Sequence, residues 1–228
     1  MDWGDAIARR AWAAADEGRD PTRGWKQRSL TAPELNSSGG GGRLPERELQ
    51  RAENLEVMGS FEAALGAYRG ALAWAPEDLA GWHGEGRCLL ALERFTEAAE
   101  RLEALLGRYP DQALVRLDLG VALDALDRIE EAREAFMAAY AELDRSDLAL
   151  ELARWELGLS TPDLGWAEKL LGDVLRADPG QIEGTLLLAK LYAAHRGDVD
   201  RARLVLRAGL DRKPGERALI EALAQLES

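Results

Sequence analysis

The sequence contains one cysteine and two histidines among its 228 residues. The single cysteine, Cys88, excludes an internal disulfide and cannot hold a zinc ion by itself. No apolar run approaches the roughly 18 residues that a membrane-spanning helix requires, so we expect no insertion into a bilayer. The first five residues lack the basic stretch and apolar core of a secretory signal, which favours a cytoplasmic protein.

Basic residues are also fewer than acidic ones. The chain has 29 Lys and Arg residues and 41 Asp and Glu residues, which gives a net charge of −12. Binding of nucleic acid needs a clustered positive surface, so we expect no nucleic-acid partner. Gly39 to Gly42 lack the lysine that follows the glycines of a phosphate-binding loop. His83 and Cys88 are five residues apart and point to different sides of a helix, which excludes a metal pair or a nucleophile and its base. We therefore expect no enzyme, no metal and no cofactor, and an enzyme with a site in a groove is the remote alternative.

One internal period of 34 to 35 residues dominates the chain. Alanines in similar local settings recur at this spacing, and prolines follow four of them after twelve residues. Asp144 takes the place of the missing proline. The two series are Ala64, Ala98, Ala132, Ala167 and Ala202, and Pro76, Pro110, Pro179 and Pro214.

Each period predicts two amphipathic helices, because its apolar residues are three and four positions apart. Small residues at Gly86 and Gly120 would let the two helices of a pair approach closely. In the fourth period we expect Thr161 to cap the second helix, and we place the extra residue of the fourth and fifth periods in the turns. The predicted turns lie at Gly59-Ser60, Glu93-Arg94, Asp127-Arg128, Ser160-Thr161-Pro162 and Arg196-Gly197-Asp198.

At these spacings the sequence resembles the tetratricopeptide repeat family. The clearest unit, 79–112, carries the motif residues Trp82, Gly86, Leu89, Phe95, Ala98, Leu102 and Pro110. The resemblance implies an all-α fold, an α-solenoid of about five helix-turn-helix repeats with a C-terminal capping helix. The expected division is a segment at 1–36, a linker at 37–44, repeats at 45–78, 79–112, 113–146, 147–181 and 182–216, and a capping helix at 217–228. Arg154 stands where a small residue is expected, which leaves the frame of the fourth repeat open by one residue.

In this family the first helix of each repeat lines a concave wall, and residues four apart share that wall. The predicted wall has an apolar middle with charges around it, which favours a groove for an amphipathic or extended apolar peptide. The alternative is that these side chains only pack against neighbouring helices. The predicted groove residues are Leu49, Glu53, Glu56, His83, Arg87, Leu90, Leu117, Val121, Asp124, Glu151, Trp155, Leu186 and Lys190.

The first 44 residues do not fit the repeat. They carry three of the seven tryptophans and a net charge of +1, and residues 21–33 contain no acid. Ser37 to Gly42 have the composition of a flexible linker. Either a partner peptide has been fused to the repeats, or the segment is a native extension. In both cases we expect contacts with the repeats through Trp3, Ile7, Trp12, Arg23, Trp25, Lys26 and Arg28.

The sequence therefore predicts a non-enzymatic adaptor, a monomer that binds a protein or peptide segment. The expected ligand is amphipathic, contains tryptophan and has basic flanks, and residues 1–36 are one candidate. The alternative is a structural solenoid that self-associates by exchanging its N-terminal arm between copies.

Overall fold

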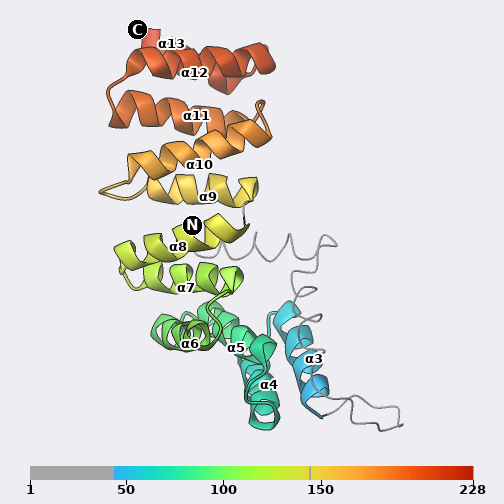
Figure 1. Ribbon diagram of the computed structural model, residues 1–228. Coiled ribbons are helices and arrows are strands. Elements are labelled where there is room, and N and C mark those ends of the chain that lie inside the picture. Colours follow the sequence, from blue (N-terminus) through green and yellow to red (C-terminus); the bar gives the residue numbers. More distant parts are fainter. Residues whose placement is uncertain (1–43, 144, 228) are drawn as a thin grey trace. The chain divides into compact units, whose positions relative to one another are not determined.

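The computed structural model describes residues 44–143 and 145–227, which form helices and contain no strand (Figure 1). Contacts between residues divide this part of the chain into two units, one ending at Leu143 and one following it. Five helix pairs and one final helix agree with the predicted fold class.

Unit 1 consists of three helix pairs. In each pair the two helices run antiparallel and pack on each other, and in the first two pairs the second helix also packs on the first helix of the next pair. The pairs are α3 (Leu44–Val57) with α4 (Phe61–Trp74), α5 (Leu79–Ala91) with α6 (Phe95–Arg108), and α7 (Ala113–Ala125) with α8 (Ile129–Leu143).

Unit 2 consists of two helix pairs and the final helix. The first pair is α9 (Ser146–Glu156) with α10 (Leu164–Ala177). The second pair is α11 (Ile182–Lys190), which continues into the π-helical turn η2 (Leu191–His195), with α12 (Val199–Arg212). The last helix, α13 (Arg217–Glu227), packs mainly on α12.

Glycines allow the close helix contacts that the sequence predicts. A Cβ atom added to Gly86 would lie 2.5 Å from Leu102 Cδ2, and one added to Gly120 would lie 2.5 Å from Phe136 Cε1. Both distances are far below van der Waals contact, so only glycine lets these helices pack at their observed separation.

Among the described residues, four of the five turns inside helix pairs contain a residue with left-handed backbone geometry, and the turn between α9 and α10 does not. Gly59 and Gly197 have φ values of 73° and 67°, as expected for glycine. Glu93 and Asp127 have φ values of 57° and 60° although they carry side chains. The same tight turn is therefore made in unit 1 with and without glycine.

Two local predictions for the later repeats were wrong. The residue that caps α10 is Asp163, whose carboxylate accepts hydrogen bonds from the backbone N–H groups of Gly165 and Trp166, and not Thr161. The extra residue of the fifth repeat lies in η2, where the Arg196 N–H donates to the Leu191 carbonyl five residues earlier, and not in the turn that follows.

Candidate functional site

The predicted groove residues of unit 1 come together on three helices that lie side by side. Helix α5 contacts both α3 and α7. We call their shared surface the α3–α5–α7 face and define it by Leu49, Glu53, Glu56, His83, Arg87, Leu90, Leu117, Val121 and Asp124.

A charged pair joins α3 to α5 on this face. Arg87 donates from Nε to Glu56 Oε1 and from Nη2 to Glu56 Oε2, both at 2.7 Å. The hydroxyl of Tyr68 on α4 donates to the same carboxylate at 2.6 Å. The side chains of Arg87 and Glu56 are only 23% and 12% exposed, so the pair is largely withdrawn from water.

These contacts set the protonation of the pair. Burial raises the pKa of Glu56, but the hydrogen bonds and positive charge of Arg87 lower it more, and the net pKa lies below its ordinary value of 4.5. Burial and the Glu56 charge together raise the pKa of Tyr68. Glu56 is therefore ionised and Tyr68 is neutral at neutral pH.

A second polar pair joins α5 to α7. His83 Nε2 lies 2.6 Å from Asp118 Oδ2, and both side chains are buried. Asp118 was missed by the sequence analysis, which placed Leu117 on the groove by counting 34 residues from His83. The residue that pairs with His83 is 35 positions away, one more than the repeat period used for the prediction.

The rest of the α3–α5–α7 face is partly apolar. Leu90, Leu117 and Val121 are buried, and Leu49 is half-buried. Glu53 is exposed, and its carboxylate accepts a hydrogen bond from Gln50 Nε2 at 3.1 Å. Asp124 is half-buried.

In unit 2 the helix register differs from the predicted frame. Helix α9 begins at Ser146, so Leu150 and Arg154 stand at the same distance from its start as His83 and Arg87 do in α5. The predicted groove residue Trp155 lies against Trp166 of α10, with a centroid distance of 6.5 Å and the rings edge to face. Glu151 is buried and accepts a hydrogen bond from Arg154 at 2.7 Å.

Two further predicted groove residues lie on α11. Leu186 is half-buried and Lys190 is exposed. The predicted anchors of the ligand segment lie outside the residues that the structure describes. These anchors are Trp3, Ile7, Trp12, Arg23, Trp25, Lys26 and Arg28.

Away from the α3–α5–α7 face, Trp82 packs against two arginines of α6. The guanidinium carbons of Arg101 and Arg108 lie 4.0 Å and 4.8 Å from its ring centre. Its indole N–H donates to the Pro76 carbonyl at 2.7 Å. The nearby Glu85 carboxylate is buried and accepts from both Arg69 and Arg101.

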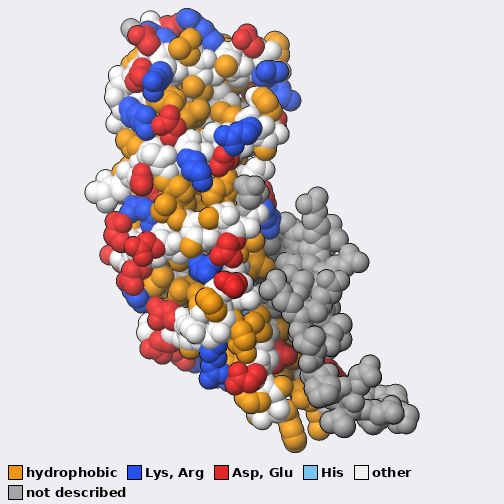
Figure 2. All heavy atoms as spheres, viewed as in Figure 1, with side chains coloured by type: hydrophobic (Ala, Val, Ile, Leu, Met, Phe, Trp, Pro, Cys, Tyr) orange, Lys and Arg blue, Asp and Glu red, His pale blue; other side chains and the backbone are white. Residues whose placement is uncertain are grey.

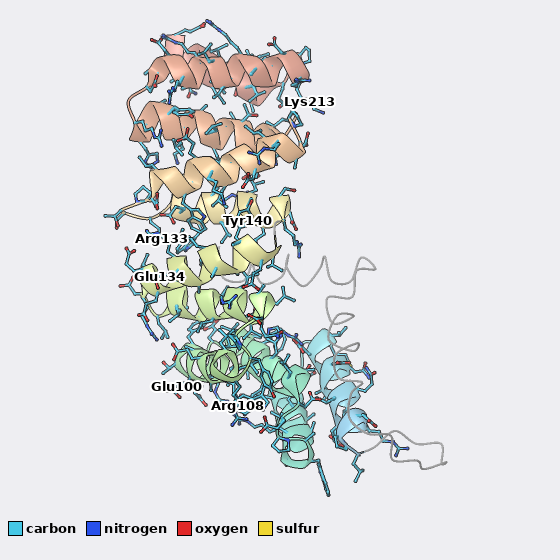
Figure 3. The ribbon with its side chains drawn as sticks, viewed as in Figure 1. Glu100, Arg108, Arg133, Glu134, Tyr140 and Lys213 are labelled. Atoms are coloured by element: carbon cyan, nitrogen blue, oxygen red, sulfur yellow. The ribbon has the colours of Figure 1, made fainter. Side chains whose placement is uncertain are left out.

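The negative charge of the protein is concentrated in unit 1. Residues 44–143 hold twenty carboxylates and ten arginines, a net charge of −10 with His83 neutral. Residues 145–227 hold fourteen acidic and twelve basic side chains, a net charge of −2. Figure 2 shows acidic side chains gathered along the side of unit 1 on which Figure 3 labels Glu100 and Glu134.

In 44–143 and 145–227 there is no group of three or more His, Cys, Asp or Glu side chains that could hold a metal ion. No helix in these ranges is long and apolar enough to cross a membrane. Burial raises the pKa of the Cys88 thiol to about 12, which keeps it protonated and weakly reactive.

The lowered pKa of Glu56 predicts a loss of stability in acid. A carboxyl group with a depressed folded-state pKa contributes stability above its ordinary pKa, here 4.5, and loses this contribution as the pH falls through the folded value. We expect Glu56→Gln to flatten the fall in unfolding free energy below pH 4.5, measured by urea denaturation at several pH values. The exposed Glu100→Gln is the control, and equal slopes for both variants would contradict the assignment.

Comparison with known proteins agrees with this architecture. The sequence profile of the tetratricopeptide repeat family matches residues 49–100 and 83–147. No match is found among curated proteins.

Solved structures with similar folds include a tetratricopeptide repeat protein from Parabacteroides merdae, with 16% identity, a TM-score of 0.63, and coverage of 81% of this chain and 73% of that one. YrrB, described as having an unusual peptide-binding site, matches with 20% identity, a TM-score of 0.59, and coverage of 77% and 89%. MamA from Desulfovibrio magneticus matches with 15% identity, a TM-score of 0.62, and coverage of 77% and 98%. The repeat period, the helix pairs and the family match lead to one conclusion: residues 49–147 are tetratricopeptide repeats, and the described residues have the fold of that family.

Proposed function

We propose that this chain is a non-enzymatic scaffold that binds a peptide segment on the α3–α5–α7 face. The proposed ligand is amphipathic, contains tryptophan and has basic flanks. Tetratricopeptide repeats bind protein or peptide partners, which supports a scaffold role in general. The peptide-binding site described for YrrB is an analogy within the same fold.

The observation that carries the proposal is the net charge of −10 on unit 1. Of its ten arginines, nine form an ion pair with a carboxylate of the same unit, such as Arg87 with Glu56 and Arg94 with Glu97. The remaining acidic excess favours a positively charged partner through complementary potential.

Residues 1–36 are a suitable ligand by composition. They hold three tryptophans and a stretch, 21–33, with basic residues and no acid. The outward side of α3 is polar and exposed at Arg47, Gln50, Arg51 and Asn54, whereas the equivalent residues of α5 are buried against α4. A polar outer face is typical of the first repeat of a solenoid. This supports our division of the chain into a segment at 1–36, a linker at 37–44 and repeats from 45 onward.

Binding is tested with a fluorescein-labelled synthetic peptide of residues 1–36. The receptor is the full chain carrying Trp3→Ala, Trp12→Ala and Trp25→Ala, so that its own segment competes weakly. We expect saturable binding by fluorescence anisotropy that weakens as salt screens the charges. Adding Glu53→Lys to the receptor should weaken binding by about fivefold, because it reverses an exposed charge on the proposed site.

The matched control is Glu100→Lys, which makes the same change in net charge on the exposed surface of α6. Equal effects of the two substitutions would show that only net charge matters, and absence of saturable binding would reject the proposed ligand. Light scattering distinguishes this scaffold from the alternative, a solenoid that self-associates. Exchange of the N-terminal arm between copies would give the mass of a dimer, and the three tryptophan substitutions would abolish that dimer.

A further inference from the structure

The most exposed apolar side chains of unit 1 lie in its first helix pair. Val57 is 90% exposed and Met58 is 74% exposed at the C-terminal end of α3. Leu44 and Trp74 are 58% and 67% exposed at the opposite end of the pair. Exposed large apolar side chains that lie together are typical of an interaction surface.

Val57 is four residues after Glu53, so the two side chains share one side of α3. Glu53 is exposed as well, and the Glu56–Arg87 pair lies beside them on the same face. The surface therefore combines an accessible carboxylate with an accessible branched apolar side chain. We call Gln50, Glu53, Val57 and Met58 the α3 patch.

Among the three described repeats of unit 1, the first alone offers this combination. In α5 the residues at the positions of Glu53 and Val57 are Arg87 and Ala91, and in α7 they are Val121 and Ala125. Arg87 is already paired with Glu56, and Val121 is buried. The α3 patch, which shares Glu53 with the α3–α5–α7 face and borders it, is thus exposed and suited to a cationic, apolar ligand.

Building on the proposed function, we infer which segment binds and where it binds. Residues 21–36 of the same chain dock on the α3 patch. This segment has the complementary chemistry, with Arg23, Lys26 and Arg28 for Glu53, and Trp25 and Leu30 for Val57 and Met58. Residues 21–33 contain three basic residues and no acidic one, so their positive charge is complementary to the negative charge of unit 1.

The length of the intervening chain allows this docking in cis. Helix α3 has 14 residues, which at 1.5 Å per residue is about 21 Å. The eight steps from Asn36 to Leu44 reach up to about 26 Å when extended. Asn36 can therefore reach the far end of α3, and residues before it can lie along the α3 patch.

Docking in cis would regulate the scaffold. A tether of this kind gives an effective concentration on the order of millimolar, so a weak contact stays occupied. A partner peptide must displace the segment before it contacts Glu53 and Val57. The apparent affinity for such a partner falls by the fraction of time that the patch is covered.

The test is cross-linking in the full chain with a short bismaleimide. Thr31→Cys is combined with Gln50→Cys in the α3 patch, or with Gly66→Cys as the control. Gly66 is exposed on α4 and has nothing within 4 Å of an added Cβ. Cys88 is buried and its raised pKa keeps it unreactive, and the chain without new cysteines checks this.

We expect the 31–50 pair to cross-link at least about tenfold faster than the 31–66 pair, at monomer mass and independently of protein concentration. Glu53→Lys and Val57→Asp should each slow the 31–50 reaction, whereas Glu100→Lys should not. Equal rates for the two pairs would overturn the inference, and a product of dimer mass would show docking between copies. Either result can occur while the labelled peptide still binds in trans, so the proposed function is tested separately.

Discussion

Replacing Phe136 with alanine should lower the free energy of unfolding of unit 1 by about 3–5 kcal/mol. The Phe136 side chain is 1% exposed and fills the space between α7 and α8 against Gly120. Alanine removes most of these contacts and leaves a cavity that two packed helices cannot close. Urea denaturation followed by circular dichroism measures the loss.

Gly120→Ala should be destabilising by about 1–3 kcal/mol for the opposite reason, because the added Cβ would lie 2.5 Å from Phe136 Cε1. In the double variant the alanine at position 120 occupies space that the ring has left, so the two losses should not add. Gly66→Ala is the matched control. It lies in α4 with nothing within 4 Å and should stabilise by about 0.5–1 kcal/mol. Additive losses would show that the helices separate rather than share one packed contact.

Arg87→Met should destabilise unit 1 by about 2–4 kcal/mol. Methionine retains much of the length of the side chain but leaves the Glu56 carboxylate with a 12% exposed side chain and no arginine. The Tyr68 hydroxyl remains as a donor but cannot balance the charge. The loss is measured by urea denaturation at pH 7, and it should shrink when Glu56→Gln is added, since the double variant buries no unpaired charge.

Arg94→Met is the control for geometry. Arg94 holds Glu97 through two hydrogen bonds of 2.7 Å and 2.6 Å, a geometry very similar to that of Arg87 with Glu56. This pair is exposed to solvent, so its removal should leave the unfolding free energy unchanged within error. Equal effects of Arg87→Met and Arg94→Met would contradict the claim that burial decides the strength of the pair.

The repeat was predictable because its markers are local. A small residue such as Gly86 or Gly120 must recur wherever two helices touch, and the alanine series keeps the same phase. The frame was ambiguous only where the period changes, at the fourth repeat. There the helix begins at Ser146, and Trp155 lies against Trp166 of its own pair.

The partners of the polar side chains were harder to predict. Asp118 could be found only by allowing an offset of one residue between neighbouring first helices. Val57 could have been found from the sequence, since it is four residues after Glu53, but its exposure follows from its position in the first repeat. Pairing and exposure depend on which helices are neighbours, and a period alone does not contain that information.

The sequence by itself determined the helical repeat, the all-α fold class and the overall negative charge, because each of these depends on composition or on spacing along one chain. The tertiary structure decided which carboxylates are exposed to solvent and which are neutralised by arginines. Glu56 and Glu85 are held by arginines from other helices, whereas Glu53 stays exposed beside Val57. The physical reason is that solvation of a side chain is set by all helices packed around it, and those contacts join residues 16 to 35 positions apart.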